Sequence, residues 1–95
     1  MYVRVVRFTD VNAERIEGVV AQIKAADGPP PGVRGTGIQV LLDQAQATAV
    51  VLQYFASQGD MEEGARVFNA MDSGETPGIR ASVDTCQVTL DLKSP

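Results

Sequence analysis

The sequence predicts an α+β domain whose elements follow the order strand, helix, strand, strand, helix, strand. Two apolar runs at 37–42 and 48–56, joined by a short polar stretch, predict a β-hairpin in the middle of the chain. Apolar residues at helical spacing on either side of this hairpin predict one helix before it and one after it. The 95 residues fit a single domain over 1–95, and 44 % apolar with 21 % charged residues is the composition of an ordinary globular chain.

The first strand is predicted over residues 1–9, where β-branched and aromatic residues dominate. Strict alternation divides it into two faces, with Tyr2, Arg4, Val6 and Phe8 on one and Val3, Val5 and Arg7 on the other. Both faces are largely apolar, so we expect both to be covered in the folded protein.

The first helix is predicted to begin after Asn12, a good N-cap residue, with Val11 and Ile16 spaced as a hydrophobic staple. Its apolar stripe consists of Ile16, Val19, Val20 and Ile23. The helix should end where a loop rich in glycine and proline begins, over 27–37. The glycines of this loop do not match a dinucleotide-binding fingerprint, because a strand and not a helix follows them.

The return strand of the hairpin, over 48–56, also carries apolar residues at helical spacing, but its β-branched and aromatic content favours a strand. Alternation places Ala49, Val51, Gln53 and Phe55 on one face and Val50, Leu52, Tyr54 and Ala56 on the other. As in the first strand, both faces are apolar.

The second helix is predicted to begin at Asp60, which together with Glu63 fits an N-cap with its capping box. Gly74 fits a C-terminal cap. The expected buried stripe consists of Met61, Ala65, Phe68 and Met71, with Gly64 and Val67 at its edges. The last strand is predicted over 79–92, with a bulge near Val83 and Asp84, because the apolar alternation changes parity there.

This order of elements predicts a ferredoxin-like α+β fold, in which a four-stranded antiparallel sheet carries both helices on one face. The second apolar face would then be bare, and a patch of that size is unusual for a monomer. We therefore expect a homodimer in which the two sheets face each other. The predicted interface residues are Val3, Val5, Arg7, Val50, Leu52 and Tyr54, with Asp84 or Asp91 as polar partners.

Charge and composition argue against several classes of function. The net charge is −4 and the basic residues are scattered singly, which argues against a nucleic-acid partner. No apolar run approaches the ~18 residues of a membrane helix, and the N-terminus is no signal peptide, so we expect no membrane partner and a cytoplasmic location.

The scarcity of metal ligands limits the chemistry further. The chain has no histidine and a single cysteine, Cys86, which argues against zinc, copper and haem-iron centres. A carboxylate site for Mg²⁺ or Ca²⁺ stays open, but no loop of spaced Asp and Glu residues indicates one, so we expect no metal site and no cofactor. Without a histidine to activate it, Cys86 fits a small apolar side chain better than a nucleophile.

The sequence resembles the dimeric α+β barrel superfamily, in particular the antibiotic-biosynthesis-monooxygenase-like domains. The resemblance covers nearly the whole chain and is carried by three stretches: Val5-Val6-Arg7-Phe8, Pro31-Gly32-Val33-Arg34-Gly35 and Phe55-Ala56-Ser57-Gln58-Gly59-Asp60-Met61. This family includes cofactor-independent monooxygenases, haem-degrading enzymes and members with no assigned activity.

The resemblance argues against haem degradation. The haem-degrading relatives use a histidine on the second helix, and this chain has none. They also use an asparagine where Val6 stands and a tryptophan where Phe55 stands. Monooxygenases that form quinones need a pocket that binds a phenolic substrate and helps form its anion. Arg, Asn, Tyr or Trp side chains can meet that role, so the lack of histidine does not argue against this activity.

The resemblance implies that Phe55 faces the helices, which places a candidate ligand site on that side of the sheet. The candidate residues are Arg4, Phe8, Gln53, Phe55, Phe68 and Asn69. An arginine beside aromatic rings in an apolar cleft could orient an aromatic or anionic organic ligand. The alternative is that Arg4 extends to the sheet edge and Gln53 makes an ordinary hydrogen bond.

Three functions follow from these observations. The first is a homodimeric barrel that binds a small organic molecule or has a structural role without chemistry. The second is a cofactor-independent monooxygenase acting on an aromatic polyketide-like substrate. The third is a small regulatory domain of ferredoxin-like topology that binds an amino acid at a dimer interface.

Overall fold

A computed structural model describes residues 1–70 and 77–94 of the chain. Its elements follow the predicted order. Their bounds are β1 Tyr2–Thr9, α1 Ala13–Ala26, β2 Gly35–Asp43, β3 Thr48–Phe55, α2 Gln58–Ala70 and β4 Ile79–Gln87. The segment over 48–55 is a strand, which resolves the ambiguity between helical and strand periodicity.

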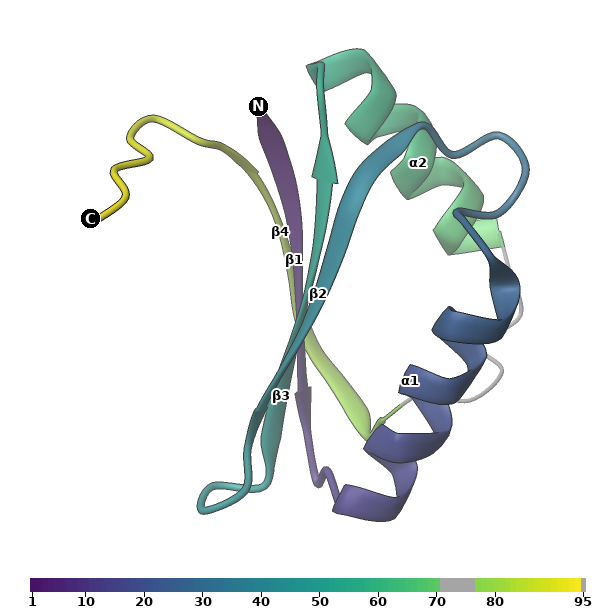
Figure 1. The fold of residues 1–95 in the computed structure, drawn as a ribbon, viewed down its shortest axis with the longest axis vertical. Coiled ribbons are helices and arrows are strands. Elements are labelled where there is room, and N and C mark those ends of the chain that lie inside the picture. Colours follow the sequence, from purple (N-terminus) through teal and green to yellow (C-terminus); the bar gives the residue numbers. More distant parts are fainter. Residues whose placement is uncertain (71–76, 95) are drawn as a thin grey trace.

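The four strands form one antiparallel sheet in the order β2-β3-β1-β4, so β1 and β3 are its central strands. Both helices lie on the same side of the sheet (Figure 1). The predicted ferredoxin-like α+β fold is therefore confirmed. β2 begins two residues earlier than predicted, with a register shift between Gly35 and Gly37.

The two faces of the central strands differ in burial as alternation predicts. We call the face toward the helices the inner face and the opposite one the outer face. On the inner face the buried residues are Arg4, Val6, Phe8, Ala49, Val51 and Phe55. On the outer face, Val3, Val5, Val50, Leu52 and Tyr54 are only half-buried and Arg7 is exposed.

The buried side chains form two separate clusters on the inner face. The first, under α1, consists of Val6, Phe8, Val11, Ile16, Ala49 and Val51. The second, under α2, consists of Val33, Phe55 and Met61. Along β1, Arg4 stands between Tyr2, which packs against the second cluster, and Val6, which belongs to the first. Arg4 and Gln53, which pairs with it on β3, thus form a polar row that separates the cluster under α1 from the cluster under α2.

The start of α1 matches the prediction. The Oδ1 atom of Asn12 accepts a hydrogen bond of 2.8 Å from the backbone N–H of Arg15. Val11 and Ile16 are both buried in the first cluster, as a hydrophobic staple requires.

The start of α2 differs from the prediction. Ser57 caps this helix, because its Oγ atom accepts a hydrogen bond of 3.1 Å from the backbone N–H of Asp60. Asp60 lies inside the first turn and is not the N-cap. The error arose because Asp60 with Glu63 imitates a capping box, whereas the chain leaves β3 and enters the helix within two residues.

Close packing under α2 also differs from the expected stripe. Met61 is buried, but Gly64, expected at the edge, is buried as well, while Ala65 and Phe68 are half-buried. A Cβ atom on Gly64 would lie 2.8 Å from Cε1 of Phe55, so the helix approaches the sheet at this glycine. Met71 and Gly74, named in the predictions for this helix, lie outside the described residues.

The last strand is shorter than predicted, since β4 ends at Gln87 and not at residue 92. Its bulge lies earlier than expected: Arg7 pairs with Ser82 and Phe8 with Arg80, which leaves Ala81 as the extra residue. The alternating apolar residues beyond Gln87 predicted a strand, but β1, the strand beside β4, begins at Tyr2, which pairs with Gln87, and so does not extend far enough to pair with them.

Candidate ligand-binding site

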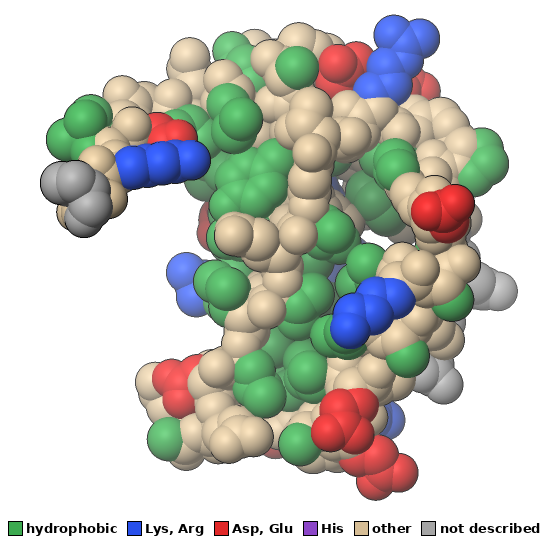
Figure 2. Space-filling view, viewed as in Figure 1, with side chains coloured by type: hydrophobic (Ala, Val, Ile, Leu, Met, Phe, Trp, Pro, Cys, Tyr) green, Lys and Arg blue, Asp and Glu red, His purple; other side chains and the backbone are tan. Residues whose placement is uncertain are grey.

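A cavity of about 1450 Å³ lies between the inner face of the sheet and the helices. Figure 2 shows this hollow with hydrophobic side chains along its walls. All six candidate residues from the sequence line it: Arg4, Phe8, Gln53, Phe55, Phe68 and Asn69. The structure therefore places them around one space, although they come from three different elements.

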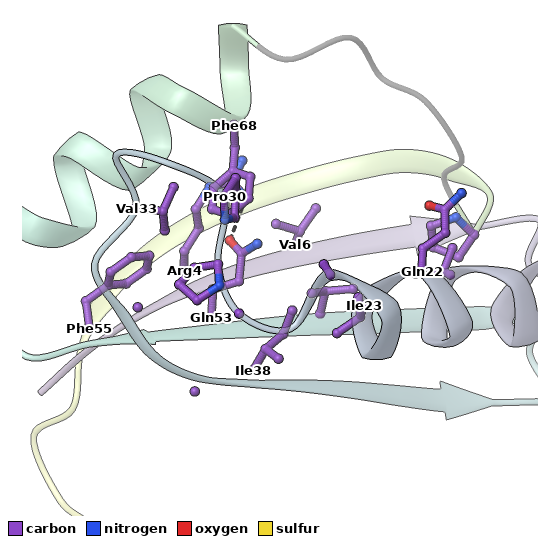
Figure 3. Close-up of a pocket in the computed structure, with 18 of the residues that line it drawn as sticks. Arg4, Val6, Gln22, Ile23, Pro30, Val33, Ile38, Gln53, Phe55 and Phe68 are labelled. Carbon is purple, nitrogen blue, oxygen red and sulfur yellow. Dashed lines mark hydrogen bonds between the residues drawn. The ribbon is translucent and has the colours of Figure 1, made fainter.

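Arg4 is the central polar residue of the cavity (Figure 3). Its side chain is only 4 % exposed, and its Nη1 atom donates a hydrogen bond of 2.8 Å to Oε1 of Gln53. Its guanidinium carbon lies 5.2 Å from the ring centroid of Phe68, in cation–π contact. Arg4 lies on a central strand and does not reach the sheet edge.

The Arg4 guanidinium has no charged partner among the residues that the structure describes. Its Nε atom is buried and has no hydrogen-bond partner there. Burial and, to a smaller extent, the positive charge of Arg80 lower the pKa of the Arg4 side chain. An arginine nevertheless stays protonated in a protein, so a positive charge remains at this point of the cavity.

The candidate residues do not all contact one another. Arg4, Gln53 and Phe68 form one connected group. Phe55 is completely buried, so its ring supports the wall from behind and offers little contact surface. Phe8 lies two positions beyond Val6 in the cluster under α1, and Asn69 is exposed near the end of α2.

Sequence reasoning missed several lining residues. Ile38 pairs with Gln53, and Arg80 pairs with Phe8, so both are on the inner face through the register of the edge strands. The end of α1 and the loop that follows it also line the cavity, through Lys24, Pro29, Pro30 and Pro31. Alternation along 37–42 could have placed Ile38, but Arg80 depended on the position of the bulge.

Other types of site are not supported in the described part of the chain. Residues 1–70 and 77–94 contain no group of three or more His, Cys, Asp or Glu side chains that could hold a metal ion. Within the same residues, no helix has the length and hydrophobicity needed to cross a membrane.

Comparison with known proteins gives the fold but no close relative. No protein-family model matches this sequence, and no similar sequence was found among the curated proteins. Among solved structures, the chain is similar to a crystal structure of a mutant of MhuD with two manganese protoporphyrin IX molecules bound per active site. The TM-score is 0.63, the identity 13 %, and the match covers 99 % of this chain and 100 % of that one.

The structural likeness does not extend to porphyrin ligation. A haem-type metal needs an axial ligand such as His, Cys, Met or Tyr. None of these residue types is found among the described residues that line the cavity. The lining therefore does not fit a metalloporphyrin held through its metal, and at this identity the comparison establishes the fold alone.

Proposed function

We propose that this protein binds a small organic molecule with an aromatic or other apolar body in the cavity between the sheet and the helices. The observation that carries the proposal is the divided core. A chain of 95 residues depends on a compact core for stability, and space left between two clusters is destabilising. A cavity with mostly apolar walls and a few convergent polar groups has the character of a ligand site.

Binding of a neutral fluorescent probe tests this proposal. N-phenylnaphthylamine should bind saturably, with a rise in fluorescence as it leaves water. Ile23 lines the cavity from α1, so Ile23→Trp should fill part of it and weaken binding by about tenfold or more, which is ~1.4 kcal/mol. The matched control is Ala21→Trp, which adds the same ring at an exposed position of the same helix.

The proposal fails if neither this probe nor any of a panel of polycyclic acids, amides and phenols binds saturably. Equal weakening by Ile23→Trp and Ala21→Trp would place the bound probe outside the cavity.

A cofactor-independent monooxygenase is the second candidate function. The observation in its favour is the cationic Arg4 beside the Phe68 ring, which could hold the anion of a phenolic substrate. Oxygen uptake with anthrone-type and quinol substrates tests it. Rates equal to those of buffer, unchanged by Arg4→Ala, would remove this candidate and leave the binding proposal intact.

We also propose that the protein is a homodimer paired through the outer faces of its sheets. On the outer face, apolar side chains of β1, β2 and β3 remain accessible, and Leu41, which lies beside Val50, is 48 % exposed. Arg7 and Asp84 are both exposed on this face. In a two-fold symmetric dimer, Arg7 of each subunit would form an ion pair with Asp84 of the partner subunit.

The C-terminal segment supports the same arrangement. Beyond β4 it is held by a hydrogen bond of 2.9 Å from the backbone N–H of Val88 to the carbonyl oxygen of Met1. It then extends away from the molecule on the side opposite the helices (Figure 1). Leu90 and Leu92 on this segment are 73 % and 82 % exposed. A second copy on the outer face would give these leucines a surface to pack against.

Two neighbouring leucines test the dimer. Leu41 is on the outer face and Leu42 on the inner one, and both are exposed near the tip of the hairpin. The wild-type protein should sediment as a dimer at micromolar concentration. Leu41→Lys should raise the dimer dissociation constant by about tenfold or more, because a charge would be buried at the interface. Leu42→Lys should leave it nearly unchanged, and a wild-type monomer at tens of micromolar would contradict the proposal.

A further inference from the structure

We propose that the ligand of this cavity carries a negatively charged oxygen group, a carboxylate or a phenolate, which binds to Arg4, and that Gln53 keeps Arg4 free to receive it. The inference rests on the proposed binding function and adds the chemical class of the ligand. It also assigns Gln53 as the residue that sets the charge preference of the site.

The first step is the state of Arg4. Burying a charged group without a counter-charge is expensive, and each buried N–H without a partner adds to that cost. Arg4 is 4 % exposed, its Nε has no hydrogen-bond partner among the described residues, and its Nη1 donates to a neutral amide oxygen. The guanidinium therefore retains both charge and donor capacity that an oxyanion could satisfy.

The second step concerns the residue opposite Arg4. Gln53 pairs directly with Arg4 between the two central strands, and its Oε1 atom accepts the 2.8 Å hydrogen bond. A glutamate has the same length and shape and would neutralise Arg4 at this position. Glutamine orients the guanidinium but leaves its charge uncompensated. Such departures from the most stable choice are expected at functional sites.

The third step is the charge of the lining as a whole. Among the described lining residues, Arg4, Lys24 and Arg80 are cationic and Asp27 is the single carboxylate. The complete chain carries a net charge of −4, so positive charge is concentrated in the cavity of an acidic protein. A cleft whose lining carries an excess of positive charge attracts ligands of negative charge.

The apolar surroundings of Arg4 indicate what the oxyanion is attached to. Ile38 lies next to Gln53 on the edge strand, Val6 lies on the other side of Arg4, and Phe68 covers the guanidinium from α2 (Figure 3). A compact inorganic anion would leave these walls uncovered. An aromatic acid or a phenol can cover them and place its oxygen at Arg4.

Two isosteric ligands separate charge from shape. Naphthoate and naphthamide have nearly the same size, but only naphthoate is an anion at neutral pH. Displacement of N-phenylnaphthylamine should show that naphthoate binds about ten- to a hundredfold more tightly, as expected for a hydrogen bond between charged groups. A naphthol titrated through its own pKa tests the phenolate in the same way, because its binding should strengthen as it ionises.

Variants of Arg4 and Gln53 test whether these two residues cause the preference for naphthoate over naphthamide. Arg4→Met keeps an unbranched, flexible side chain but removes the charge and the guanidinium donors, and Gln53→Glu supplies an internal counter-charge. Both should reduce the preference for naphthoate over naphthamide to about twofold or less, with each affinity measured relative to that variant's own affinity for N-phenylnaphthylamine. Gln53→Glu should also raise the melting temperature by several degrees, because it neutralises a buried charge. Arg15→Met, on an exposed arginine at the start of α1, is the control and should change neither property.

The outcomes are distinguishable. Equal affinity for naphthoate and naphthamide in the wild type, with saturable binding of both, would overturn the proposal that the cavity prefers an anion. The proposed binding function would still stand. A preference for naphthoate that survives both Arg4→Met and Gln53→Glu would show that another cation, and not Arg4, binds the oxyanion. If no probe binds, the proposed function fails and this inference fails with it.

Discussion

Phe55→Ala is expected to lower the free energy of unfolding by about 3–5 kcal/mol, the usual cost of emptying a fully buried aromatic site. Phe55 is 0 % exposed and belongs to the small cluster under α2 together with Val33 and Met61. Urea unfolding followed by circular dichroism measures the change, and a loss below about 1 kcal/mol would contradict this account of the core.

Gly64 provides the control for this prediction. Its missing side chain makes room for the Phe55 ring, since a Cβ atom would lie 2.8 Å from Cε1 of that ring. In the wild type, Gly64→Ala should therefore be destabilising or neutral, although alanine is favoured over glycine by about 1 kcal/mol inside a helix. In the Phe55→Ala background the contact is gone and Gly64→Ala should become stabilising. Equal effects in both backgrounds would show that the two residues do not interact.

Gly78→Ala is the second large effect, with an expected loss of about 3 kcal/mol, at the upper end of the range for overpacking. A Cβ atom at Gly78 would lie 2.2 Å from the carbonyl oxygen of Thr9 and 3.1 Å from Cγ2 of Val11. The first contact is with backbone that is held in place by the pairing of Thr9 with Ile79. Thermal unfolding should show a fall of more than ten degrees, given about 4–8 °C per kcal/mol for a domain of this size.

A matched glycine distinguishes this steric effect from a general intolerance of alanine. At Gly59, near the start of α2, the nearest heavy atom to an added Cβ is the Oγ atom of Ser57 at 4.0 Å. Gly59→Ala should therefore be neutral or stabilising by about 0.4–1 kcal/mol, mainly because alanine restricts the unfolded chain. If Gly78→Ala unfolds at the temperature of the wild type, the close approach of Gly78 to Thr9 is not a constraint on this fold.

The divided core connects these stability predictions to the proposed function. One cluster is organised by α1 and the other by α2, and the row that contains Arg4 and Gln53 separates them. Filling this row with apolar side chains would join the two clusters, but it would also remove the polar centre of the cavity. Stability and ligand binding therefore make opposite demands on the same two positions.

Local patterns in the sequence were sufficient for the order of elements and for the inner and outer faces of the central strands. Alternation of Arg4, Val6 and Phe8 with their neighbours determines which side of β1 is buried, because successive side chains of a strand point to opposite faces. The N-cap at Asn12 could be predicted for a similar reason, since the residues involved are adjacent in sequence.

Features that depend on contacts between distant residues were decided by the tertiary structure. Ser57 replaced Asp60 as the cap because the position of Phe55 in the sheet sets where α2 begins. The bulge at Ala81 and the end of β4 at Gln87 depend on how β4 pairs with β1, and the pattern of residues 79–92 alone does not specify that pairing. Most importantly, Arg4 and Gln53 are 49 positions apart, and only the pairing of β1 with β3 places the charge beside a neutral amide between two hydrophobic clusters. The sequence by itself determined which residues face inward, whereas their convergence on one cavity required the register of the whole sheet, because periodicity specifies a face and not a neighbour.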